Sequence, residues 1–444
     1  MSIIFAEIIN QNGTLSLNLG TGAPVDPVES QGLLLDDLGQ IYATDTVPPT
    51  KYAYGLPFDD NGRLVLEDDT IAYYSQGLPF TANNALAAAN DEAVGGFYNQ
   101  GLRFNDSGTL AVTGLTPPPP SPPTVWGPLL RYLNNAAFTG VEVRKIAADG
   151  NGVWVALGSG AGAASRSIDD GANWTALPSG LNSGSATAAW RSIGTDMDGV
   201  WVAGAQSGYV ARSADNGATW AAVTRGLNTG VNPTWQAIKT DKAGVWVAVA
   251  LAGYASRSID NGLTWTGLTQ GLNSGNPTGN LNGLATDGQG NWIAGGASTT
   301  TCARSTDNGA TWTALNISSS PTDNIQSIVA DEDGNFIAFG GTGYAWRSVD
   351  AGASWTLITP QGLNSGSITL SMNGSAIDPF GSVVVGGSGG YAAYSVDTGA
   401  TFSVLTRGLN SGSTVETLQT VATDNNGIWM AGFQNGFIAR SPPL

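Results

Sequence analysis

Short apolar runs of strand length recur along residues 124–444, separated by turns rich in Gly, Asn and Asp. The most regular run reads Gly-Val-Trp-Val-Ala, at residues 199–203 and 244–248, and each copy follows a Thr-Asp pair and a Gly-containing turn. Brief apolar runs bounded by turn residues predict buried strands. The run recurs seven times, centred on Trp154, Trp201, Trp246, Trp292, Phe336, Val384 and Trp429.

A second motif, Ser-x-Asp-x-Gly-x-x-Trp/Phe, follows six of these runs, after a strand of the form Gly-Tyr-x-x-Arg-Ser. The Asp can accept backbone N–H groups across a tight turn, Gly permits a positive φ, and Trp packs between sheets. Each period of about 45 residues therefore contains four strands, which is the length and strand number typical of one propeller blade. The Asp residues are structural candidates: Asp169, Asp215, Asp260, Asp307, Asp350 and Asp397.

These six motifs resemble the Asp-box, or BNR, repeat. The resemblance implies a β-propeller in which each box caps the hairpin between the third and fourth strands of a blade.

Seven blades are expected, although only six boxes occur. The last period stops after its third strand, at residues 436–441, whereas residues 125–135 align with a fourth strand at 219–229. We therefore predict an all-β, seven-bladed β-propeller that closes when residues 124–131 pair with the C-terminal strand.

Residues before the propeller follow a different repeat, Gly-Leu-x-x-x-x-x-Gly-x-Leu/Ile, with copies starting at Gly32, Gly55, Gly77 and Gly101, although Asn84 replaces the second Gly of the third copy. Such runs predict β-hairpins that turn at Asp-Asn-Gly or similar sequences. Four small hairpins bury little apolar area, so we expect them to fold against a neighbouring chain. The predicted domains are a hairpin region at 1–115, a proline-rich spacer at 116–123 and the propeller at 124–444.

The Gly-Leu-Pro-Phe hairpins also resemble short repeats near the N-termini of bacteriophage virion proteins, over about residues 30–115. This resemblance implies a particle component, located in a virion that is assembled in the host cytoplasm. Its partners through residues 1–115 would be other virion proteins and copies of itself.

Composition removes several functional classes. The formal charge is −17, which argues against nucleic-acid binding through a basic surface. Histidine is absent and Cys302 is the only cysteine, so Ser-His-Asp triads, Cys-His pairs, the usual zinc sites and internal disulfides are excluded. Because Cys302 aligns with Val210 in the repeat, a core position is expected. No secretory signal or long apolar stretch occurs, so we predict no membrane insertion, and neither a metal nor a cofactor is expected.

One face of the ring is a candidate binding surface. The Gly-Leu-Asn-Ser/Thr-Gly loops should lie beside the turns that lead into the third strands, where Asn and aromatic side chains suit a sugar or a protein. The alternative interpretation is that Asn makes a good turn and Tyr fills gaps between blades. The candidates are Asn182, Asn228, Asn273, Asn364, Asn410, Tyr209, Tyr254, Tyr344 and Tyr391.

The predicted function is a virion structural or appendage protein, such as a fibre, tail or capsid-decorating component, whose propeller contacts a host-surface glycan or a protein. No enzymatic activity is expected. The alternative is a carbohydrate-active Asp-box enzyme or lectin, using acids such as Asp196 or Glu142. Sialidases share the boxes but need an arginine cluster, and only Arg144 and Arg191 lack an obvious repeat role. Likeness to Asp-box assembly factors of photosynthetic membranes implies a third option, a chaperone-like binding module.

Overall fold

The computed structural model describes residues 103–104, 110–111, 124–129, 133, 141–160, 162–299, 302–318, 323–365, 367–411 and 415–442. The chain divides into two units, residues 1–118 and 119–444. In the first unit, β1 (Arg103–Phe104) pairs antiparallel with β2 (Leu110–Ala111), which overlaps the hairpin predicted at 101–110 and extends one residue beyond it. The other predicted hairpins and the spacer at 116–123 lie outside the described residues.

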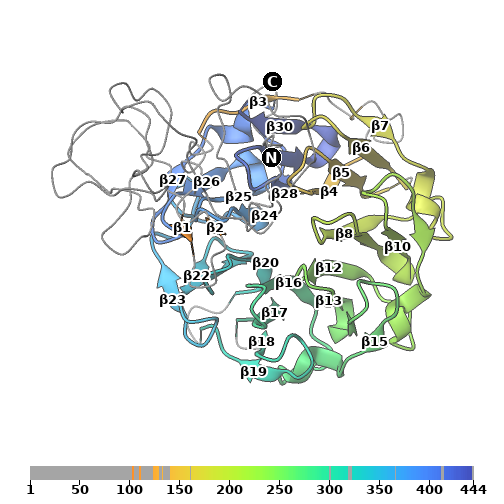
Figure 1. Ribbon diagram of the computed structural model, residues 1–444. Helices are drawn as coiled ribbons and strands as arrows, with labels where there is room; N and C mark the ends of the chain where they lie inside the picture. The colour runs from red at the N-terminus through yellow and green to blue at the C-terminus, as the bar shows by residue number, and fades with distance from the viewer. Residues whose placement is uncertain are drawn as a thin grey trace, which may run out of the picture. The chain divides into compact units, whose positions relative to one another are not determined.

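The second unit is a ring of seven four-stranded antiparallel sheets (Figure 1). This confirms the predicted seven-bladed propeller. The innermost strands surround the central channel and each ends directly before an Asp, as the sequence predicts. They are β4 (Val143–Ala148), β8 (Trp190–Thr195), β12 (Trp235–Thr240), β16 (Leu281–Thr286), β20 (Ile325–Ala330), β24 (Met372–Ile377) and β28 (Leu418–Thr423).

The second strand of every blade is buried at all five positions. Each sheet is covered by another blade on both faces, so both sides of this strand must be apolar, which explains the unbroken Trp-Val-Ala runs. These strands are β5 (Trp154–Gly158), β9 (Trp201–Ala205), β13 (Trp246–Ala250), β17 (Trp292–Gly296), β21 (Phe336–Gly340), β25 (Val383–Gly387) and β29 (Trp429–Phe433).

Six of the seven third strands carry an Arg-Ser pair, β26 has Tyr394-Ser395 instead, and the fourth strands form the rim of the ring. The third strands are β6 (Ala164–Ser167), β10 (Val210–Ser213), β14 (Ala255–Ser258), β18 (Cys302–Ser305), β22 (Ala345–Ser348), β26 (Ala392–Ser395) and β30 (Ile438–Ser441). The fourth strands are β7 (Thr175–Ala176), β11 (Ala221–Ala222), β15 (Thr266–Gly267), β19 (Thr313–Leu315), β23 (Thr356–Ile358), β27 (Ser403–Val404) and β3 (Gly127–Pro128).

The ring closes as predicted, through a strand from the N-terminal side of the propeller. β3 pairs antiparallel with β30, with Gly127 opposite Arg440 and Pro128 opposite Ala439. The Leu129 amide extends this pairing by donating to the Ile438 carbonyl at 3.0 Å. Trp126 and Leu129 are buried, so closure joins side-chain packing to backbone pairing.

Seven hydrophobic clusters fill the wedges between consecutive blades. In the wedge between the first two blades, Val155 and Leu157 of β5 pack against Trp201 of β9 and Trp220 of the box. Cys302 is fully buried in the wedge that contains Ile325 and Phe336, which confirms its predicted core position.

Short 3-10 turns connect the strands, and no α-helix occurs among the residues just described. In the Gly-Leu-Asn turns, Gly is needed sterically: a Cβ on Gly226, whose φ is 72°, would meet the Val231 carbonyl oxygen at 1.9 Å. The turns are η3 (Ser179–Asn182), η4 (Gln206–Gly208), η5 (Arg225–Asn228), η6 (Leu251–Gly253), η7 (Gln270–Asn273), η8 (Ser388–Gly390), η9 (Arg407–Asn410) and η10 (Gln434–Gly436).

Candidate functional site: the central channel

A β-bulge disturbs the register of every innermost strand at its second residue. Bulges re-aim side chains and often lie beside functional sites. Here the bulged residue is polar in all seven blades, in contrast to the buried apolar residue that precedes it. These residues form a polar ring of Arg144, Arg191, Gln236, Asn282, Gln326, Asn373 and Gln419.

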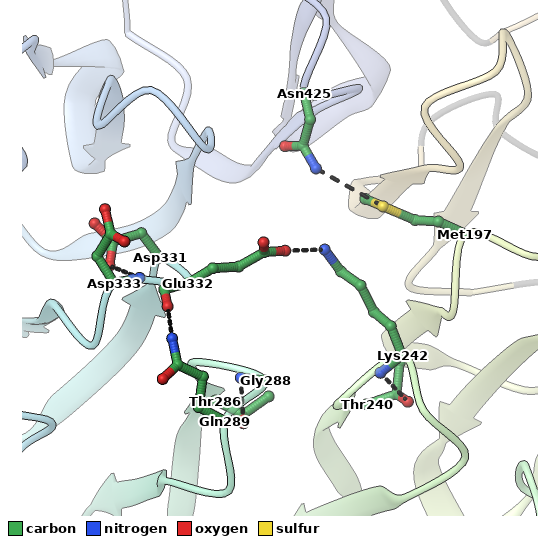
Figure 2. A network of polar contacts seen from close by, with 10 residues as sticks. All are labelled: Met197, Thr240, Lys242, Thr286, Gly288, Gln289, Asp331, Glu332, Asp333 and Asn425. Carbon is green, nitrogen blue, oxygen red and sulfur yellow. Dashed lines mark hydrogen bonds and ion pairs between the residues drawn. The ribbon is translucent and has the colours of Figure 1, made fainter. Parts of the chain in front are cut away.

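At the Asp-box side of the channel, the turns between first and second strands surround a cavity of about 260 Å³. Figure 2 shows two links between blades that are not neighbours. Lys242 Nζ lies 3.0 Å from Glu332 Oε1, and Asn425 Nδ2 lies 3.8 Å from Met197 Sδ. Gln289 also donates its amide to the Glu332 carbonyl (Figure 2). Because Lys242 and Glu332 are exposed, their ion pair contributes little to the stability of the fold. The pair does narrow the opening of the channel on the Asp-box side.

Farther along the channel, a second cavity of about 80 Å³ is lined by Lys145 of β4 and Lys239 of β12. Neither Asp nor Glu occurs among the described residues that line it. Desolvation and then the charges of Lys239, Arg144 and Arg191, in that order, together lower the pKa of Lys145 to about 8. Lys239 is exposed to solvent, yet the surrounding protein lowers its pKa, first by desolvation and then through Lys242.

The two arginines without a repeat role lie on adjacent strands, β4 and β8. Arg144 is held by Glu142 at 2.7 Å and donates to Gln419 Oε1 at 2.8 Å. Desolvation lowers its pKa, and the positive charge of Arg191 lowers it further, whereas Glu142 acts in the opposite direction. The Nε of Arg191 is buried and has no hydrogen-bond partner. Together, Arg144, Lys145, Arg191 and Lys239 form what we call the cation cluster.

The two acids proposed for an enzyme, Asp196 and Glu142, differ in their surroundings. Asp196 is 6% exposed and closes a turn by accepting the amides of Asp198 and Val200, while Asn261 of the next blade donates to its other oxygen at 2.9 Å. Glu142 is engaged by Arg144 and by Gln434.

The six box aspartates have the structural surroundings that the motif predicts. In one of them, Asp350 accepts the Ser354 hydroxyl and amide together with the Ser348 hydroxyl. The Ser354 hydroxyl, followed by its amide, lowers the pKa of Asp350 to about 2 against the opposing effect of desolvation. The same pattern recurs at Asp169, Asp215, Asp260, Asp307 and Asp397, where hydrogen bonds outweigh desolvation and lower the pKa.

The loop asparagines use their amides inside the ring. Each donates Nδ2 to the backbone carbonyl of the box Trp or Phe in the following blade, or to Trp126 in the closing strand. The distances are 3.2 Å for Asn182, 2.7 Å for Asn228, 3.1 Å for Asn273, 2.8 Å for Asn364 and 2.9 Å for Asn410. A binding role for this face stays a prediction, and these donors already join blades.

The loop-face tyrosines Tyr209, Tyr254, Tyr344 and Tyr391 are half-buried and pack against the wedge clusters. Arg225 lies 4.2 Å from the centre of the Tyr209 ring, and Arg407 lies 4.3 Å from that of Tyr391. These contacts are cation–π pairs that occupy one face of each ring.

The arginines of the Arg-Ser pairs bind the neighbouring blade, which explains their repetition. Each donates Nε to a backbone carbonyl in the next box, at 2.6 to 3.1 Å. The pairs are Arg166 with Asn216, Arg212 with Asn261, Arg257 with Asn308, Arg304 with Ala351, Arg347 with Thr398 and Arg440 with Asp170.

The sequence analysis identified Arg144 and Arg191 as arginines without a role in the repeat, but it did not identify Lys145 and Lys239 as candidate site residues. One signal was present: residues 124–444 contain only three lysines, Lys145, Lys239 and Lys242, and all lie on innermost strands or the turns that follow them. Within the described ranges, no group of three or more Cys, Asp or Glu side chains is suited to a metal ion. No helix in those ranges is long and apolar enough to span a bilayer.

The sequence matches no protein family and no curated protein. Solved structures do resemble the propeller. YCF48 bound to D1 peptide matches at a TM-score of 0.54 and 16% identity, covering 74% of this chain and 99% of that one. Residues 119–444 of this chain therefore form a β-propeller, as the solved structures that match it do. A GH74 xyloglucanase from Xanthomonas campestris matches at 0.53 and 16% identity, and the GH74 enzyme of Niastella koreensis at 0.52 and 18%.

These likenesses concern the fold alone. Each GH74 match covers 71% of this chain but only 53% of the enzyme, so this chain spans about half of each GH74 protein. In total, 1278 solved chains match, and the group includes both a peptide-bound propeller and enzymes. The fold therefore does not select a function.

Proposed function

We propose that this chain is a non-enzymatic binding and structural protein of a bacteriophage particle. In this proposal residues 1–115 attach to the particle, and the propeller contacts a protein or a host-surface glycan. The supporting observation is that the repeated polar side chains of the propeller hold its turns and its neighbouring blades together. The box Asp residues close turns, and the loop Asn and strand Arg residues bond to the next blade.

The particle assignment rests on the Gly-Leu-Pro-Phe hairpins, which resemble those of bacteriophage virion proteins. A role in protein contact is supported by the similarity to YCF48, a propeller solved with a bound peptide. The experiment is mass spectrometry of purified, nuclease-treated particles, in which peptides of this chain should co-purify at constant stoichiometry. Their absence from particles, with the chain present in the host lysate, would contradict the assignment.

The alternative is a carbohydrate-active enzyme, favoured by the GH74 similarity. Since Asp196 is buried in a turn and Glu142 is paired with Arg144, we expect no turnover of xyloglucan, sialosides or fluorogenic glycosides. Asp196→Asn and Glu142→Gln are the matched variants for this assay. Turnover above the buffer rate that disappears in either variant would favour the enzyme.

A further inference from the structure

The cation cluster is unusual for this chain. Residues 124–444 contain 20 acids and 14 bases, yet four of the bases meet around one part of the channel. The arginines of the repeat are committed to neighbouring blades or turns, so the cluster gathers bases that the architecture does not require. Glu142 is the carboxylate paired with this cluster, through Arg144.

Bringing like charges together in a partly desolvated space costs free energy unless an opposite charge compensates. The lowered pKa of Lys145 reflects that cost, because desolvation and the charges of Lys239, Arg144 and Arg191 all act on it. Arg191 adds a buried Nε without a partner, on a guanidinium that also acts on Lys145. One Glu cannot balance four cations, so the cluster is suited to an additional negative group.

The cavity beside Lys145 and Lys239 has the chemistry for such a group. It is also lined by Gln236 and Gln326, whose side-chain amides carry hydrogen-bond donors, whereas Ser192 and Asn282 already donate to backbone carbonyls. Its volume of about 80 Å³ suits one carboxylate or phosphate group and is too small for a sugar chain. Charge-assisted hydrogen bonds from ammonium and guanidinium groups are the strong contacts for oxyanions.

We propose that the channel binds an oxyanion, a carboxylate or phosphate group, between Lys145 and Lys239 with Arg191 beside it. Arg144 is a positioning residue in this site, because it is already held by Glu142 and Gln419. The site does not depend on the particle assignment, and particle mass spectrometry would neither support nor weaken it.

Isothermal titration calorimetry of the full chain at pH 7 tests this proposal, with ionic strength held constant by sodium chloride. The probes are inorganic phosphate, citrate and the peptide acetyl-Gly-Asp-Asp-Glu, which separate a free anion from a polypeptide carboxylate. We expect saturable one-to-one binding of at least one probe, with a Kd of about 1 mM or lower. Lys145→Gln and Lys239→Gln should each weaken binding about tenfold.

Lys242→Gln removes a lysine that pairs with Glu332 and does not line this cavity, although its charge acts on Lys239, so it should weaken binding less than the other two variants do. Lys239→Arg keeps the charge and should retain most of the binding. Unchanged melting temperatures would show that the variants fold. A second readout is acylation of Lys145 at pH 8, followed by mass spectrometry, which the bound probe should slow. The proposal would be overturned by the absence of saturable binding for every probe, or by Gln variants that both bind as tightly as the unaltered chain.

Discussion

At the scale of single residues, the position after the box Asp joins neighbouring blades in the three boxes where it is Asn. Asn216 donates its amide to Asp149 of the preceding blade at 2.6 Å and accepts Trp201 Nε1 at 2.8 Å. The same pairs recur around Asn261 and Asn308. The first blade has Asp170 at this position. There Trp154 Nε1 has no partner, and desolvation together with the charge of Asp170 raises the pKa of Asp424.

Replacing Asp170 with Asn should therefore stabilise the ring. The amide restores a donor for Asp424, a bond that can turn the amide oxygen toward Trp154 Nε1 as in the other junctions, and it removes a repulsion between carboxylates. We expect a gain of about 1–2 kcal/mol in the free energy of unfolding, seen as a few degrees in the melting temperature. Asn216→Asp is the matched control and should lower it, because it recreates the defect at another junction. A neutral or destabilising Asp170→Asn would show that this pattern does not govern the junction.

Cys302 should be chemically silent in the folded chain. Desolvation raises the pKa of its thiol to about 12, so almost no thiolate exists at pH 8, and its side chain is fully buried. We expect no labelling by iodoacetamide in native buffer and complete labelling in guanidinium chloride, as measured by intact mass. Rapid native labelling would contradict the buried position.

At the scale of elements, the closing strand determines whether the ring is complete. β3 supplies the fourth strand of the last blade, and Trp126, Leu129 and Leu133 are 3%, 8% and 0% exposed. Deleting residues 124–133 removes all three side chains and exposes β30 as a free edge.

This deletion should lower the free energy of unfolding by about 5 kcal/mol or more, given the usual cost of removing buried large side chains. Cutting at residue 115 keeps the strand and should change the melting temperature little. Calorimetry of both truncations, with Trp126→Ala as a milder variant, measures the difference. Equal melting of the two truncations would contradict closure by this strand.

At the scale of the whole molecule, the box aspartates make stability depend on pH. Their pKa values are lowered in the folded state, so each contributes stability above its unfolded pKa near 4 and loses it as the pH falls. Asp378 and Asp424 act in the opposite direction, since desolvation raises their pKa.

Because six groups outweigh two, the melting temperature should fall as the pH decreases from about 4 to about 2, the pKa of Asp350. Calorimetry across this range measures the slope. Asp350→Asn keeps the shape of the turn and should make the slope shallower. A melting temperature that stays constant down to pH 2 would contradict the prediction.

The amino-acid sequence by itself determined the strands, the number of blades and the manner of closure. These features depend on contacts within one repeat or between equivalent positions of adjacent repeats, so periodicity reveals them. The Ser213–Asp215–Trp220 box is one example, because its hydrogen bonds lie within eight residues. The incomplete last repeat likewise indicated that residues 124–131 had to complete it.

Only the tertiary structure decided what the channel contains. Arg144, Arg191 and Lys239 are separated by about 50 residues along the chain, and each looks like a single irregularity in its own repeat. They form one cluster because the closed ring turns innermost strands toward a common axis, and the bulges at Arg144 and Arg191 re-aim those two side chains. Likewise, the loop asparagines had the composition of a binding surface, but the packing of adjacent blades gave their amides structural partners. A charged or hydrogen-bonding side chain forms part of a site only when residues from other repeats lie beside it. Closure of the ring sets the distances between those residues.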